Sequence, residues 1–562
     1  GGIVYGNVYG GGSLGDVGTI DKTDQTDYNY SWTDQDGNPN TTANSGNKNT
    51  GVCKVTITGG SVGTENKSTA NHASGHVFGA GKGKDDTYWC EKAMVYSTKV
   101  TISKGTVWGN VYGGGQIGRV ENNAVVEIGS ASEDDDVADI KGNIFGAGAG
   151  LNTHGYSALV RGNATVAVKG KARVGQSVYG GGEIASVGRF YVDTATSLPT
   201  EPRSGGTCTV TVNGNAAITG NIYGACKGIT PDYAHATQHW KNDNKPYSFD
   251  DEADYLKFLK TLALTSNTDV AIGERATIGG DVYGGGQRGI TLGYVEVDVE
   301  GGTITKDVYG GGALADTNTS NWDGSSLTAK YYEVIGLTPG TSDVTGLYTK
   351  DGSTYTAATG TAVDGTTYYR LTNTIVRLTG GTINGAAYGG GLGDANTPAY
   401  VYGDVTVKLN ENKTAGDKGC IVGKVFGCNN LNGTPKGHVQ VYVYATQNKN
   451  TSYTTIGSNK TPTGRHEGFE TLTGDQTTTY DVEAVYGGGN LSPYEPVDAY
   501  LEDNATNKEK IEAAQTEVYI YGCDLSSIKY VYGGGNAAAA PATYVRVDGA
   551  YEIEELFAGG NG

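Results

Sequence analysis

Cysteine is scarce in this chain of 562 residues, with seven copies, and methionine occurs once. No two cysteines form a C-x-x-C pair, which argues against a zinc ribbon. Local disulfides between Cys208 and Cys226 or between Cys420 and Cys428 fit the spacing. Small buried thiols in strands fit it equally well. The cysteines therefore leave the redox compartment open.

Basic residues are also under-represented, with 41 Lys and Arg against 60 Asp and Glu and a net charge of -19. This balance argues against a nucleic-acid partner, because phosphate neutralisation needs clustered cations. No apolar run is long enough to span a bilayer, and the opening Gly1-Gly-Ile-Val-Tyr5 is not a signal peptide. Because no initiator methionine is present, we expect a mature region or a piece of a larger protein.

Glycine and tyrosine are abundant, with 92 and 39 copies, and Val, Ile and Tyr alternate between the glycines as packed strands require. An aliphatic–aromatic–Gly–small–Gly phrase recurs thirteen times. Its copies begin at Val8, Val77, Val111, Ile144, Val178, Ile222, Val282, Val308, Ala387, Val425, Val485, Val531 and, in degenerate form, Leu556.

A second phrase, an alternating strand followed by a turn and an apolar step, lies upstream of most copies, as in Val295-Glu-Val-Asp-Val-Glu-Gly-Gly-Thr-Ile304. Period-two alternation buries one face of a strand. The Gly-Gly and Asn-Gly pairs supply the positive φ of tight turns.

The spacing between copies distinguishes the possible architectures. The shortest intervals are 25 and 26 residues and the longest is 79. Propeller blades need roughly 40–50 residues each, whereas one coil of a solenoid fits about 25. The sequence therefore predicts an all-β fold, a single-stranded parallel β-helix (β-solenoid) of about thirteen coils, continuous over 1–562. At ~4.8 Å per coil the rod would be roughly 60 Å long.

In this fold the aliphatic residue of each phrase points inward and the adjacent aromatic residue points the opposite way. Equivalent rings stack from coil to coil, and the following glycines leave room for the ring of a neighbouring coil. We call the predicted stack the aromatic ladder and expect it to be packing, with carbohydrate binding as an alternative. Its members are Tyr9, Phe78, Tyr112, Phe145, Tyr179, Tyr223, Tyr283, Tyr309, Tyr388, Phe426, Tyr486 and Tyr532.

Three insertions interrupt the repeat. Residues 231–268 predict a short helix lying on the rod, with Ser248 as N-cap and Leu256, Leu259 and Ala263 on one face. Residues 500–516 predict a second short helix. Residues 330–371 carry hairpin signals and predict a small β knob, either a decoration or a binding element.

Candidate metal ligands are few. His235 and His239 have i, i+4 spacing if helical, but no Glu follows the first His as in metalloproteases. Asp134 and Asp136 belong to an acidic run that is either solvated surface or a Ca²⁺ site. We expect no other cofactor. Since no nucleophile elbow with a triad and no phosphate loop followed by a helix is present, we expect no enzyme.

The phrase Gly301-Gly-Thr-Ile-x-x-x-Val-Tyr-Gly-Gly-Gly312 resembles the large repetitive surface proteins of gut Bacteroidales and neighbouring bacteria. It is similar, more loosely, to β-helical adhesins and autotransporter passenger domains. The resemblance implies an architecture and no catalytic residues.

We therefore expect an extracellular or cell-surface structural rod: a stalk, fibre subunit or adhesin segment. Its partners would be further repeats, other copies of itself stacked end to end, glycans or a host surface. The competing hypothesis is a carbohydrate-binding or polysaccharide-degrading β-helix.

Overall fold

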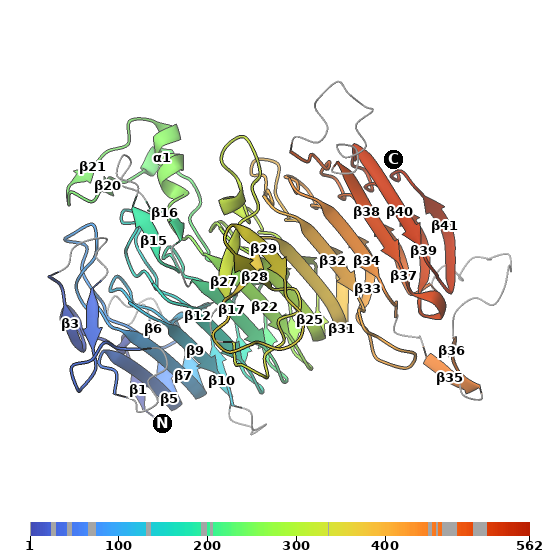
Figure 1. Ribbon diagram of the computed structural model, residues 1–562. Coiled ribbons are helices and arrows are strands. Elements are labelled where there is room, and N and C mark those ends of the chain that lie inside the picture. The colour runs from blue at the N-terminus through green and yellow to red at the C-terminus, as the bar shows by residue number, and fades with distance from the viewer. Residues whose placement is uncertain are drawn as a thin grey trace.

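The computed structural model describes residues 2–23, 30–41, 48–65, 75–130, 137–192, 199–202, 206–334, 337–447, 452–456, 459–463, 480–497 and 514–562. A 29-stranded sheet winds through the molecule, and all its pairings are parallel. Successive coils lie side by side from the blue N-terminal end to the red C-terminal end (Figure 1). The predicted parallel β-helix is confirmed.

Each copy of the aliphatic–aromatic phrase forms or ends a strand that pairs in register with the next copy. These strands are β2 (Val8–Tyr9), β6 (Val77–Phe78), β8 (Val111–Tyr112), β11 (Ile144–Phe145), β14 (Val178–Tyr179), β19 (Ile222–Tyr223), β24 (Val282–Tyr283), β26 (Val308–Tyr309), β31 (Thr374–Tyr388), β33 (Ile421–Phe426), β37 (Val482–Tyr486), β39 (Ser527–Tyr532) and β41 (Glu552–Phe557).

The alternating strands form a second parallel stack. It contains β5 (Val52–Val62), β7 (Ser97–Val107), β9 (Ala124–Ile128), β12 (Ala164–Val168), β17 (Thr207–Val212), β22 (Asn267–Ile272), β25 (Val295–Ile304), β31, β32 (Val405–Leu409), β34 (Val439–Val443), β38 (Gln515–Ile520) and β40 (Ala542–Val547). Short steps between the two stacks are β1 (Ile3–Val4), β10 (Ala138–Ile140), β13 (Arg173–Val174), β18 (Ala217–Ile218) and β23 (Thr277–Ile278).

The core of the rod consists of the inward-facing aliphatic side chains of all three strand positions. Val166, Ile140 and Val178, one from each position, are all fully buried. They belong to one hydrophobic cluster that extends from Val55 to Val531. Burying each such side chain contributes about 1.5–3 kcal/mol. Because no coil encloses these side chains alone, stacking is what stabilises each coil.

Two kinds of glycine have different physical roles. Gly302 lies inside β25, at a shift in its register with β31, and has φ +76°, which favours glycine. Gly146, the first glycine of a repeat phrase, has no such φ. A Cβ at Gly146 would instead lie 2.1 Å from the carbonyl oxygen of Gly180 in the next coil. The phrase glycines therefore let two backbones approach, and the expectation that they make room for a ring is wrong.

The insertion at 231–268 contains α1 (Glu252–Leu259), the short 3₁₀ helix η1 (Tyr233–His235) and the strands β20 (His239–Trp240) and β21 (Pro246–Tyr247). The N-cap of α1 is Asp251, whose carboxylate accepts the Asp254 amide at 2.8 Å, and the expectation of Ser248 is wrong.

The buried face of α1 also differs from the prediction. Tyr255 and Phe258 are buried, and Phe249 packs against both of their rings. Leu256 is 37% exposed, and Ala263 follows the helix with φ +56°. Tyr255 and Phe258 have i, i+3 spacing, and Leu256 and Leu259 have the same spacing. The helical period alone therefore does not decide which of the two pairs is buried. The large aromatic side chains gain more from burial and take the inner face.

Residues 330–371 form a knob, an antiparallel sheet with the strand order β27 (Tyr331–Val334), β30 (Tyr368–Leu371), β28 (Tyr348–Asp351) and β29 (Thr354–Ala357). Figure 1 shows β27–β29 in front of the rod near β22 and β25. The helix predicted at 500–516 lies outside the described residues except for its end, where β38 begins at Gln515.

Smaller hairpins decorate the rod elsewhere. They are β3 (Thr19–Asp21) with β4 (Ser31–Thr33), β15 (Phe190–Val192) with β16 (Pro199–Pro202), and β35 (Ser452–Ile456) with β36 (Asn459–Thr463). Two short 3₁₀ helices, η2 (Thr319–Asn321) and η4 (Cys523–Leu525), lie in turns.

All seven cysteines lie in the described part of the chain and all are free thiols, so neither sequence-compatible disulfide forms. Six are buried and Cys523 is exposed. Burial raises the pKa of Cys420 to about 12, which suppresses the reactive thiolate. We expect an aromatic disulfide reagent to titrate one thiol in the native protein and seven after denaturation, and a Cys523→Ser variant to titrate none before denaturation. More than one fast-reacting native thiol would contradict this burial.

Candidate functional site

The aromatic ladder is a continuous column of rings. Neighbouring ring centroids from Tyr9 to Tyr532 lie 4.6–5.0 Å apart with interplanar angles of 3–11°. Phe557, which the sequence analysis left out, adds a thirteenth ring 5.1 Å from Tyr532. From Phe78 to Tyr532 the rings are only 0–6% exposed. Because each ring covers the faces of its neighbours, the interior ladder offers no free face to a sugar.

Several tyrosine hydroxyls of the ladder are bonded to polar side chains of other coils. Tyr112 donates to Glu183 at 2.6 Å and Tyr179 donates to Gln287 at 2.8 Å. Tyr309 accepts from Asn430 at 2.8 Å. These bonds satisfy hydroxyls that would otherwise be buried without a partner, so the ladder is a packing device with a polar margin.

A polar column beside the ladder was missed by the sequence analysis. In the first eight copies of the phrase, the residue before the aliphatic–aromatic pair accepts the backbone N–H of the equivalent residue in the next coil, at 2.8–3.1 Å. The acceptors are Asn7, His76, Asn110, Asn143, Ser177, Asn221, Asp281 and Asp307. The sequence does carry a signal for this column: a polar residue, mostly Asn, Asp or Ser, stands directly before the aliphatic–aromatic pair in these copies. Short polar side chains of this kind bond to nearby backbone.

The candidate metal ligands do not converge. His235 belongs to η1, is highly exposed and contacts Asp232 at 3.0 Å, whereas His239 begins β20 and stacks on Phe249 at 4.4 Å. The two histidines are not on one helix, so that premise is wrong. Asp134 and Asp136 lie outside the described residues, and Ca²⁺ binding there stays a prediction. Among the described residues no group of three or more His, Cys, Asp or Glu side chains could hold a metal ion.

A cluster of ionic side chains lies where the knob contacts β25 and β31. Arg370 of the knob and Arg377 of β31 both form ion pairs with Glu296, and Arg377 also contacts Asp298 at 3.1 Å. Burial, reinforced by the carboxylates of Asp269 and Glu300, raises the pKa of Asp298 to about 7. Arg370 thereby attaches the knob to the rod, and Asp298 can hold a proton near neutral pH.

Replacement of Asp298 by asparagine is expected to stabilise the protein at alkaline pH. The folded-state pKa lies above the ordinary value of an aspartate, about 4, so the folded state binds one more proton than the unfolded state between about pH 4 and pH 7. The contribution of Asp298 to the free energy of unfolding is therefore fully present below about pH 4 and is lost as the pH rises through about 7. We expect the melting temperatures of the wild type and Asp298→Asn to be similar at pH 4, with the variant melting higher at pH 8.

Asp323 is a control with the opposite sign. Backbone and side-chain hydrogen bonds from Ser325 and Ser326 hold the pKa of this exposed carboxyl well below its usual range. Its stabilising contribution is constant above pH 4, so Asp323→Asn should shift the melting temperature equally at pH 4.5 and pH 8. A similarly uniform shift for Asp298→Asn would contradict the proton at Asp298.

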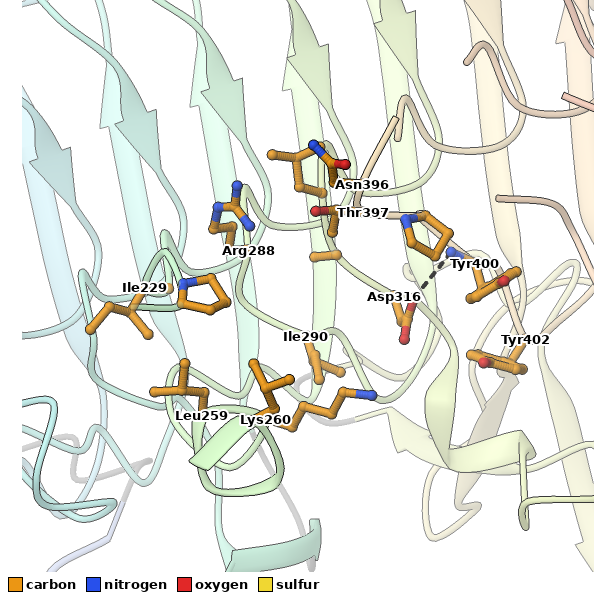
Figure 2. Close-up of a pocket in the computed structure, with 16 residues that line it drawn as sticks. Ile229, Leu259, Lys260, Arg288, Ile290, Asp316, Asn396, Thr397, Tyr400 and Tyr402 are labelled. Carbon is orange, nitrogen blue, oxygen red and sulfur yellow. Dashed lines mark hydrogen bonds between the residues drawn. The ribbon is translucent and has the colours of Figure 1, made fainter. Parts of the chain in front are cut away.

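An open groove of about 450 Å³ lies between α1 and the turns of the rod. Figure 2 shows Ile229 and Leu259 at one end and Tyr400 and Tyr402 at the other. The other lining residues are Gly228, Pro231, Leu256, Lys260, Arg288, Ile290, Leu314, Ala315, Asp316, Asn396, Thr397 and Pro398. These residues come from α1 and from the turns that follow β19, β24, β26 and β31, so the groove runs along the rod axis.

The polar groups of the groove are placed by the backbone. Asp316 accepts the Tyr400 amide at 3.0 Å, the bond drawn dashed in Figure 2. Burial raises the pKa of Asp316, while Lys260 opposes that rise. Tyr402 stacks on Trp322 at 5.3 Å, and Trp322 lines an adjoining hollow of about 300 Å³ that shares Lys260, Ile290, Asp316 and Tyr402 with the groove. The two hollows form one continuous amphipathic surface.

Comparisons of the chain with protein-family models, with curated proteins and with solved structures found no match. Within the described residues, no helix is long and apolar enough to cross a membrane.

Proposed function

We propose that this chain is a structural or adhesive segment of an extracellular rod: a stalk, a fibre subunit or part of an adhesin. The single observation that carries the proposal is the continuous aromatic ladder, in which every coil is in contact with the next through a stacked ring. The stacked rings, the aliphatic core and the coil-to-coil hydrogen bonds all join neighbouring coils along the rod axis. Each of them therefore opposes bending of the rod. A stiff spacer is the role that such repetition supports best.

Strands β1 and β41 each pair with a single neighbour among the described strands, β5 and β39 respectively. Strands β1 and β41 are the end strands in Figure 1, and their side chains Ile3, Val4, Leu556 and Phe557 are 41–54% exposed. An exposed strand edge is a template for another strand. We propose that a second copy of the chain pairs with these edges.

Electron microscopy of the purified chain tests the proposal. Thirteen coils at ~4.8 Å predict straight particles roughly 60 Å long, or filaments in which that length repeats. Monodisperse rods would remove end-to-end stacking from the proposal and leave the stiff spacer. Compact globular particles, or chains bent at variable positions, would overturn the spacer itself.

A polysaccharide-acting β-helix is the second candidate, because the ionic cluster brings Asp269, Glu296 and Asp298 together with Arg370 and Arg377. A carboxyl group that keeps a proton near pH 7 is suited to general acid catalysis. Incubation with neutral and uronic-acid polysaccharides, followed by measurement of new reducing ends, tests this candidate. Cleavage that is lost in Asp298→Asn would support it, and an unchanged polymer length with all substrates would remove it.

A further inference from the structure

The groove beside α1 exposes apolar surface that the fold leaves uncovered. Leu256 is 37% exposed, and Leu259, Ile229 and Ile290 line the same hollow while only half-buried. The inward-facing aliphatic side chains of the rod core, in contrast, are almost fully buried. A concave, mostly apolar hollow of 300–1,000 Å³ with a few polar groups is typical of a small-molecule site. The apolar side of the groove therefore fits the hydrophobic body of a small ligand.

The charges of the groove favour one sign of ligand. Lys260 and Arg288 are exposed or half-exposed at the groove, and in the described part of the chain neither is within 4 Å of a carboxylate. The carboxylates that face them are Asp316, opposite Lys260, and Asp394, near Arg288. Lys436 lies over the Tyr400 ring at 5.2 Å, but it does not line the groove and is paired with Glu495 at 3.8 Å. Among the residues that line the groove, two cations therefore stand against one carboxylate, in a chain whose net charge is -19.

The geometry places the cations within reach of a ligand that lies on the apolar wall. In Figure 2 the Lys260 side chain extends along one edge of the groove, with its amine directed toward Asp316. Arg288 lies on the opposite edge, above Leu259 and Ile229. A ligand between these edges would contact aliphatic side chains on one side, the Tyr402 ring at one end and a guanidinium or ammonium group at either edge.

We infer that the groove binds an amphipathic organic anion, a compact apolar ring or chain system that carries one carboxylate, sulfate or sulfonate group. The apolar body covers Leu256, Leu259 and Ile290, and the anionic group pairs with Arg288 or Lys260. A linear saccharide fits less well, because its hydroxyl groups would face the aliphatic wall without hydrogen-bond partners. Aromatic faces suited to a sugar occur only at the Tyr402 end.

The test uses two fluorescent probes with nearly the same aromatic body. 8-Anilinonaphthalene-1-sulfonate carries the anionic group, and N-phenyl-1-naphthylamine lacks it. We expect the sulfonate to bind the folded chain saturably at one site and the neutral probe to bind more weakly. The double variant Lys260→Gln, Arg288→Gln should weaken sulfonate binding about tenfold or more, the size expected when charge-assisted hydrogen bonds are lost. The same variant should change the dissociation constant of the neutral probe by no more than about twofold.

Two further variants localise the site. Leu256 lies on the exposed side of α1. We expect Leu256→Asp to weaken the binding of both probes and to leave the melting temperature unchanged. Lys350→Gln, on the knob, is a matched control that should affect neither probe. Non-saturable binding, or sulfonate binding that none of the groove variants changes, would overturn the inference. Displacement of the sulfonate by neutral or uronic-acid oligosaccharides would also overturn it and assign the groove to a saccharide.

Discussion

Replacement of Gly146 by valine is expected to disrupt the packing of two neighbouring coils and to cost more than about 3 kcal/mol, because backbone overlap is added to the usual cost of overpacking. The new Cβ would lie 2.1 Å from the Gly180 carbonyl oxygen, and both residues directly follow strands, β11 and β14, that are paired in parallel. The same approach of 2.1–2.4 Å recurs at the first glycine of every other phrase except the last, which has Ala558 at that position. Relief requires the coils to separate, which breaks the flanking hydrogen bonds and the ring stack.

Gly423 provides the matched control. It lies within β33, has no positive φ, and has nothing within 4 Å of the position where a Cβ would be. Gly423→Ala should therefore be tolerated, with a change within about 0.5 kcal/mol, which is usual for a surface site. Urea unfolding followed by circular dichroism compares the two variants. A well-folded Gly146→Val with wild-type stability would show that the coils can separate at low cost and would contradict the steric argument.

The repeat phrase was sufficient to predict the fold, because each copy combines three requirements of a coil in five residues. Val178 supplies the core, Tyr179 the ladder and Gly180 the close approach of the backbones, and the 25-residue minimum spacing excludes larger units. The stacking of thirteen rings then follows from parallel in-register pairing. A local pattern repeated along the chain predicts a global fold when every contact is between equivalent positions.

The groove could not be predicted from the sequence, because its lining residues do not recur at equivalent positions of the repeat. Leu259 and Tyr402 are 143 positions apart in sequence (402 minus 259) and belong to an insertion and to a turn. The sequence placed Leu256 on one face of the helix with Leu259 and Ala263, whereas Tyr255 and Phe258 occupy the buried face. Rotation of the helix by about one residue therefore buries Tyr255 and leaves Leu256 in the wall of the groove. Only tertiary packing decides that rotation.

Removal of one ring from the middle of the aromatic ladder should be the most damaging side-chain truncation in the molecule. Phe145 is fully buried, with ring centroids 4.9 Å from Tyr112 and 4.8 Å from Tyr179. Phe145→Ala leaves a cavity bounded by two rings that are fixed by strand pairing and cannot collapse into it. A cost of about 3–5 kcal/mol is typical of such a substitution.

Phe557→Ala is the control of the same residue type at the end of the ladder. Phe557 is 41% exposed and stacks on one ring only, Tyr532, so its loss should cost less than half as much. Because long repeat arrays can depart from two-state unfolding, amide hydrogen exchange is the sharper measurement. Phe145→Ala should accelerate exchange in β8, β11 and β14 and leave β39 protected, since each coil contacts only its neighbours. Equal effects of the two substitutions, or uniform acceleration along the whole rod, would contradict a ladder that acts through nearest-neighbour stacking.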